Sequence, residues 1–216
     1  MTDSRFAAGL RLAVTTLTVA PVRPGRVDRG SAAIAMAAAP FVGIGLGLVC
    51  GAVLLGLRAL SAPPLLAGVT VVGAGALLTR GLHLDGLADT ADALGSYRDR
   101  EAALAIMKRP DVGPFGVVAL VLVLLAQAAA IAALAGRSAV PVLLAVTTAT
   151  ATGRLAVTWA CRRGVPAARP DGLGALVAGT VGPAALAAGT AAVALLAIPA
   201  VPGRLWQGPA AVAAAL

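Results

Sequence analysis

The sequence predicts an all-α integral membrane protein, a polytopic helical bundle with about five to seven transmembrane helices. Of its 216 residues, 59% are hydrophobic and only 12% are charged, whereas soluble domains are nearer half apolar and a quarter charged. The apolar residues lie in long uncharged runs, at 30–57, 59–79, 112–136 and 172–203. A soluble all-α core is the competing interpretation, but one domain of this size could hardly bury four such runs.

We expect a single membrane domain over residues 1–216, with spans at about 33–56, 61–79, 114–135, 140–160 and 174–198. Residues 6–20 form either an interfacial helix or a short extra span, ended by Pro21 and Pro24. The last apolar run begins near Leu205 and has 12 residues, too few to cross a bilayer alone. We therefore expect either that the chain is truncated there or that this tail lies on the membrane surface.

The basic residues are distributed unevenly about these spans. If the N-terminus is cytoplasmic, all but three of the 17 Lys and Arg residues fall on the cytoplasmic side, the exceptions being Arg58, Arg137 and Arg204. Cytoplasmic loops of membrane proteins carry such an excess. The pattern predicts a multi-pass protein of the cell membrane, and it explains the net charge of +8 without nucleic-acid binding.

Acidic residues concentrate in one predicted cytoplasmic loop, residues 80–112, which holds six of the nine in the chain. Within it, Asp85, Asp89 and Asp92 are spaced i, i+4, i+7 and would share one face of a helix. Three neighbouring carboxylates repel one another unless a divalent cation is bound, and Mg²⁺ prefers such oxygen ligands. A solvated acidic face is the alternative. However, Leu84, Leu87, Ala88 and Ala91 give this helix an apolar side that could dock on the spans.

His83, the only histidine, precedes the first of these acids and could be a ligand, a general base, an orienting partner or a structural residue. Candidates for binding substrate phosphate are Arg80, Lys108, Arg109 and Arg154. Lys108 and Arg109 lie just before a Gly- and Pro-rich helix start whose N–H groups would suit an anion, and Asp111 could add a ligand. Alternatively they are ordinary inner-side charges, and Arg154 extends to the membrane surface. Together these residues suggest metal-assisted phosphoryl or nucleotidyl transfer at a membrane.

Two strings carry a family resemblance: HLDGLADTADAL at 83–94 and IMKRPDVGPFGV at 106–117. With RGSAAIAMAAAPFVGIGLG at 29–47, the Arg154 region and DGLG at 171–174, they resemble the adenosylcobinamide-GDP ribazoletransferases, also called cobalamin (5′-phosphate) synthases. The resemblance covers most of the chain. It implies a Mg²⁺-dependent membrane enzyme that joins adenosylcobinamide-GDP to α-ribazole or its 5′-phosphate and releases GMP. It also implies that Asp85, Asp89 and Asp92 are metal ligands and that His83 belongs to the catalytic set.

The sequence departs from this family pattern in two places. Many relatives read K/R-D-S-R where this chain has Lys108-Arg109-Pro110-Asp111, so acid and base exchange places. Relatives also continue with a Gly-rich T-G-D segment and further acids, whereas nothing acidic follows Asp171 here. If that segment completes the metal site, we expect a weakly active or inactive chain, or a fragment of a longer protein.

The expected partners are the two substrates and the lipid bilayer, with other cobalamin-pathway proteins as candidates. Alternative functions are a CDP-alcohol phosphotransferase, a prenyl-diphosphate enzyme and a cation transporter. The first two expect acidic motifs that this chain lacks. A transporter would place acids near the bilayer midplane, yet here they fall at loops or span ends.

Overall fold

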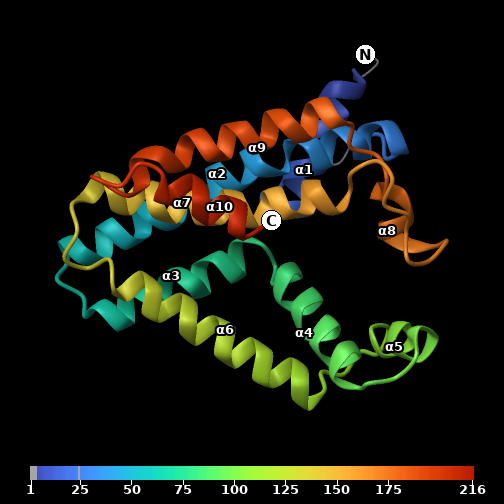
Figure 1. Ribbon diagram of the computed structural model, residues 1–216, viewed down its shortest axis with the longest axis horizontal. Coiled ribbons are helices and arrows are strands. Elements are labelled where there is room, and N and C mark those ends of the chain that lie inside the picture. Colours follow the sequence, from blue (N-terminus) through green and yellow to red (C-terminus); the bar gives the residue numbers. More distant parts are fainter. Residues whose placement is uncertain (1–3, 24) are drawn as a thin grey trace. The chain divides into compact units, whose positions relative to one another are not determined.

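The computed structural model describes residues 4–23 and 25–216, and in that part of the chain it consists of helices with a single isolated β-bridge, between Arg162 and Val181. The predicted all-α class is confirmed (Figure 1). Pro24, expected to help end the first helix, lies outside the described residues. By internal packing the chain divides into two compact units. The first comprises the residues up to Gly56 together with Arg137–Leu216, and the second comprises Leu57–Gly136.

The first unit contains most of the long helices. Its elements are α1 (Arg5–Leu17), α2 (Arg29–Ala59, whose last turn enters the second unit), α7 (Ala139–Ala160), α8 (Gly172–Val177), α9 (Pro183–Ala197), the short 3₁₀ helix η1 (Ile198–Ala200) and α10 (Gln207–Ala214). The second unit is built from α3 (Pro64–Leu78), α4 (Leu82–Gly95), α5 (Arg100–Ile106) and α6 (Pro114–Ala132).

Among the residues that the structure describes, four helical segments are long and apolar enough to cross a bilayer: α2, α6, α7 and Pro183–Ala200. The pair α3 and α4 adds a fifth only if it is counted as one broken span, because the chain bends by 94° between them. The structure therefore supports four or five crossings, and the higher counts in the expected range of five to seven are not confirmed.

The span expected at 174–198 is interrupted. The short helix α8 ends at Val177, Gly179 adopts a left-handed conformation (φ +70°), and α9 begins at Pro183. Glycine takes that conformation at little cost, and proline suits the first position of a helix because it has no N–H to leave unpaired. The expected span at 61–79 is likewise shorter, since α3 covers only 15 residues before the bend.

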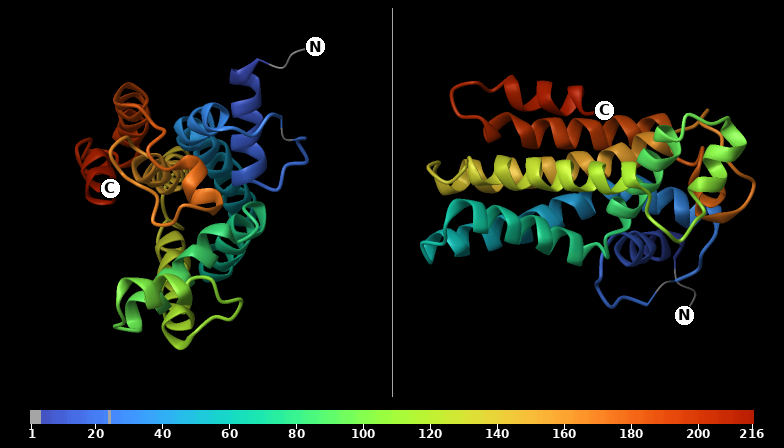
Figure 2. Two further views of the ribbon diagram at one scale, coloured as in Figure 1. Left: turned by 90° about the vertical axis from the view of Figure 1, so that its right-hand side faces the viewer. Right: turned by 90° about the horizontal axis from the view of Figure 1, so that it is seen from below.

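The N-terminal helix α1 has 13 residues, which corresponds to about 20 Å and is shorter than the hydrocarbon core. It crosses α2 instead of running along it, as the right-hand view of Figure 2 shows. A Cβ on Gly9 would meet Ile34 of α2 at 2.5 Å, so the two helices touch closely there. These features favour the interfacial helix over the extra span.

Helices α2 and α7 pack against each other along a stripe of glycines. A Cβ on Gly43 would meet the Cα of Ala151 at 2.8 Å, and one on Gly47 would meet the Cα of Thr147 at 2.5 Å. Because the partner number falls as the glycine number rises, the two helices are antiparallel. Small residues let backbones approach in this way, as the sequence predicted for its spans.

A proline inside α2 is compensated by a side chain of α7. Pro40 has no N–H, so the carbonyl of Met36, four residues earlier, receives no helical hydrogen bond from it. The buried hydroxyl of Thr158 donates to that carbonyl at 2.8 Å. Threonine hydroxyls on neighbouring helices are one of the ways in which membrane proteins tolerate proline within a span.

In the second unit, α3 and α4 both pack on α6. The contact between α3 and α6 is close because a Cβ on Gly68 would overlap the carbonyl oxygen of Ala128. Helix α4 leaves the end of α3 and reaches the start of α6 (Figure 1). The 80–112 segment therefore comprises α4, α5 and the turn that leads into α6.

Candidate functional site

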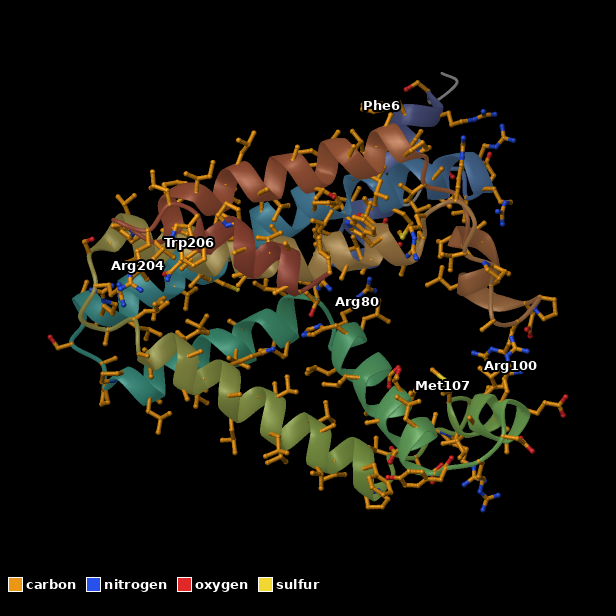
Figure 3. All side chains as sticks on the ribbon, viewed as in Figure 1. Phe6, Arg80, Arg100, Met107, Arg204 and Trp206 are labelled. Carbon is orange, nitrogen blue, oxygen red and sulfur yellow. The ribbon has the colours of Figure 1, made fainter. Side chains whose placement is uncertain are left out.

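The acid-bearing helix α4 takes its direction from the turn that ends α3. The N–H of Gly81 donates to the carbonyl of Ala76 at 2.8 Å and that of Arg80 to Leu77 at 3.1 Å, which is the Schellman pattern. Both residues are left-handed, with φ +55° at Arg80 and +66° at Gly81. A left-handed backbone costs a residue with a side chain roughly 1–2 kcal/mol, so Arg80 holds a strained position in this turn (Figure 3).

The three aspartates lie on one helix, as the spacing predicted, and they are close enough to affect one another. The pKa of Asp89 is raised above its ordinary value, first by burial and then by the negative charges of Asp85 and Asp92. Ala88 and Ala93 of α4 are buried, whereas Leu84, Leu87 and Ala91 are half-buried. The three aspartates therefore share one face of α4, and the docking of its apolar side on the spans stays a prediction.

Asp92 makes two hydrogen bonds to the start of α6. Its Oδ2 accepts from the N–H of Gly113 at 2.7 Å, and its Oδ1 accepts from the N–H of Gly116 at 2.8 Å. We expected the N–H groups of this helix start to suit a phosphate. Two of them instead donate to a side chain of the same chain.

The basic residues before α6 are solvent-exposed. Lys108 and Arg109 lie in the turn that follows α5, and Asp111 is exposed as well. This turn carries their charge at the surface near the start of α6. Their binding of substrate phosphate stays a prediction.

His83 lies in the first turn of α4 and is paired with a threonine that sequence reasoning missed. Its Nδ1 is 3.2 Å from the hydroxyl of Thr79, which also lies 2.8 Å from the carbonyl of Gly75. Thr79 is buried, whereas His83 is exposed. Thr79 and His83 are four residues apart in the sequence. Because the chain bends between α3 and α4, this spacing alone did not predict that the two side chains would be in contact.

Arg154 belongs to the other unit and lies in α7, within one of the apolar spans. Its Cβ and Cγ approach Gly43 so closely that a Cβ there would meet them at 3.0 and 2.9 Å. Its Nε is buried and, among the described residues, has no hydrogen-bond partner. A buried guanidinium nitrogen of this kind suits an anionic ligand.

The carboxylates of α4 fit Mg²⁺ as a pair. Within the described residues, no group of three His, Cys, Asp or Glu side chains is arranged to hold a metal ion. Mg²⁺ is commonly held by only one or two carboxylates, with substrate phosphates and water completing its shell. The mutual repulsion that acts on Asp89 is the kind that a cation relieves. Asp85 and Asp89 therefore fit a metal that is shared with a diphosphate.

Apolar helices sufficient for four or five crossings define a polytopic membrane protein. Its acidic helix α4 is the second member of the bent pair α3 and α4. The chain belongs to the cobalamin-5-phosphate synthase family, whose model matches residues 9–216. The resemblance found in the sequence is thereby confirmed.

Relatives from several bacteria are similar to this chain, and each bears the name adenosylcobinamide-GDP ribazoletransferase. The protein of Frankia casuarinae is 48% identical over 183 residues, covering 79% of this chain and 64% of the relative. That of Nocardioides is 47% identical over 172 residues, covering 79% and 73%. The chain thus spans less than two thirds of the length of the Frankia relative. No solved structure matches it.

Proposed function

We propose that this chain is a membrane-bound adenosylcobinamide-GDP ribazoletransferase. It would join adenosylcobinamide-GDP to α-ribazole, or to α-ribazole 5′-phosphate, and release GMP. The observation that carries the proposal is the pair Asp85, which is exposed, and Asp89, which is half-buried, one helical turn apart on α4, in a chain whose family and named relatives point to this reaction. That membership favours this reaction over the CDP-alcohol, prenyl-diphosphate and transporter alternatives.

Asp85 and Asp89 would hold Mg²⁺ against the diphosphate of the substrate. The bound ion would supply neutralisation of the charge that develops on the diphosphate as GMP leaves. Asp92 was expected as a third ligand. Its two oxygens accept backbone N–H groups, so its contribution to the metal shell stays a prediction.

The other predicted residues would bind and orient the reactants. Arg80, Lys108 and Arg109 carry positive charge around α4 and α5 and would hold non-bridging phosphate oxygens. In the other unit, considered by itself, the buried Nε of Arg154 would bind an anionic ligand. His83 would accept the proton of the ribazole hydroxyl that attacks the phosphorus on the cobinamide side.

We also propose that α4 faces the cytoplasm and that the protein lies in the cell membrane. The support is the charge asymmetry: if the chain makes five crossings, with the bent pair α3 and α4 as one of them, only Arg58, Arg137 and Arg204 lie on the opposite side. Proteins of the same pathway would then reach the site from the cytoplasm.

GMP release by the reconstituted chain tests the activity. Adenosylcobinamide-GDP and α-ribazole are supplied with and without Mg²⁺, beside the variant Asp89→Asn. We expect release that requires the metal and falls at least a hundredfold in the variant, because one of two carboxylate ligands is lost. Because the chain spans less than two thirds of the Frankia relative, a silent wild type is followed by the same assay on the full-length Frankia protein. Failure of that longer protein would overturn the assignment.

A further inference from the structure

The contacts of Asp92 distinguish it from the other two aspartates of α4. We propose that Asp92 is a positioning residue: its carboxylate joins α4 to the first turn of α6 and so holds Asp85 and Asp89 in place. This inference rests on the proposed function, because it concerns the same site. It differs from the expectation that all three aspartates are equivalent metal ligands.

The start of α6 needs an acceptor that its own residues do not supply. The first N–H groups of a helix have no partner within the helix, and a side chain at the N-cap usually accepts from them. Here the N-cap is Gly113, which has no side chain, and the next residue is Pro114. Asp92, 21 residues earlier, takes the place of the capping side chain with both of its oxygens. A negative charge is also favoured at a helix N-terminus.

Two glycines make room for this carboxylate. A Cβ on Gly113 would meet Asp92 Oδ1 at 2.5 Å, and one on Gly116 would overlap Asp92 Oδ2. Any other residue at either position would push the carboxylate away from α6. The two glycines of the sequence G-P-F-G therefore leave the space that the Asp92 carboxylate occupies.

The two bonds fix the orientation of α4 at its C-terminal half. Phe115 adds to the contact, because a Cβ on Gly95 would overlap its ring. The other end of α4 is held by the turn at Arg80 and Gly81. Asp85 and Asp89 lie between these two attachments, so their spacing relative to a bound diphosphate depends on both.

Exchanging Gly116 for alanine separates the two roles of Asp92. Gly116→Ala keeps all three carboxylates but displaces Asp92, whereas Asp92→Asn keeps the glycine and removes the charge. Gly73→Ala on α3 is the matched control, because the space around Gly73 is open among the described residues. The full chain in detergent is studied by Mn²⁺ binding without substrate, by thermal unfolding without metal, and by GMP release per folded protein.

A positioning role predicts that Gly116→Ala and Asp92→Asn both lower kcat at least tenfold at temperatures where each is fully folded. It also predicts that the double variant is little worse than either alone. Both variants should unfold at lower temperature without metal, and both should retain Mn²⁺ binding within a few-fold. Asp89→Asn should instead abolish Mn²⁺ binding.

The proposal is overturned if Asp92→Asn abolishes Mn²⁺ binding as Asp89→Asn does, or if Gly116→Ala behaves like Gly73→Ala. Mn²⁺ binding and metal-free unfolding need no cobinamide substrate. A chain that fails to release GMP but shows the predicted pattern in those two measurements would refute the proposed reaction and leave the role of Asp92 standing.

Discussion

At the scale of single residues, the contact between Thr79 and His83 bears on which ring nitrogen of the histidine carries the proton. The Thr79 hydroxyl has one proton, and its shorter contact, at 2.8 Å, is with the carbonyl of Gly75. The same oxygen is then left to accept from Nδ1–H of His83 at 3.2 Å. The tautomer of a histidine is set in this way by the partner of one ring nitrogen. We therefore expect the proton on Nδ1, which would leave Nε2 as the nitrogen that acts as a base in the proposed reaction.

Replacing Thr79 should remove the hydrogen bond that favours a proton on Nδ1 of His83. In Thr79→Val we expect His83 to shift toward the Nε2–H tautomer and kcat to fall about tenfold, less than the roughly 10²–10⁴-fold that general-base catalysis contributes in full. Nitrogen NMR reads the tautomer without ambiguity, because the chain contains one histidine. Spectra are recorded near pH 8.5, about two units above the ordinary imidazole pKa.

Thr70→Val is the control, since Thr70 lies on the same helix and its hydroxyl donates only to the carbonyl of Leu66 among the described bonds. A wild type that already holds its proton on Nε2 would contradict this account. So would a Thr79 variant with an unchanged tautomer.

At the scale of elements, the hydroxyl of Thr158 in α7 donates a hydrogen bond to the Met36 carbonyl of α2, beside the glycine stripe on which the two helices pack. In Thr158→Val the Met36 carbonyl loses its donor, and a buried unpaired group of this kind costs about 1–3 kcal/mol. In the background Pro40→Ala, the new N–H of residue 40 supplies the helical bond. We therefore expect Thr158→Val to cost much less there, as measured by the free energy of unfolding in detergent.

Thr148→Val provides a matched control for this cycle. Thr148 is also buried in α7, but its hydroxyl has no hydrogen-bond partner among the described residues. Removing it should leave the free energy of unfolding unchanged or raise it. Equal costs of Thr158→Val in both backgrounds would refute the compensation of Pro40.

Sequence patterns predicted some of these helices well and missed one break between them. Spans with a continuous apolar run, such as α6 and α7, were located to within a few residues, because length and hydropathy alone decide them. The acidic face of α4 followed from its i, i+4, i+7 spacing. The break before α9 was missed although Gly179 and Pro183 mark it, because hydropathy does not fall there.

The contacts of Asp92 and Thr158 could not have been predicted in this way. They join residues 21 to 24 and 122 positions apart, and they depend on how one helix packs on another. Spacing along one helix carries no information about such pairs. The bend at Arg80 was hidden for a related reason, since an arginine in the left-handed conformation has no local signature.

At the scale of the whole molecule, the membrane orientation can be tested with reporter cysteines. Both native cysteines are free and buried, so they should react little with a membrane-impermeant maleimide. Gly136 and Arg98 are exposed and are separated by the span α6. In intact cells we expect Gly136→Cys to be labelled and Arg98→Cys to be labelled only after permeabilisation. The reverse pattern would place α4 outside the cytoplasm.

The proline in α2 also has a consequence for how the chain is made. Ribosomes deliver α2 to the bilayer long before α7, since Thr158 follows Met36 by 122 residues. Until α7 arrives, the Met36 carbonyl has no donor from its own helix, and lipid offers none. Water or a helper protein must satisfy it in the interval. The Met36 carbonyl thus receives its hydrogen bond only when α7 is inserted. A chain that ends before Thr158 would keep an unpaired carbonyl inside the membrane, and we expect membrane proteases to degrade it faster than the full chain.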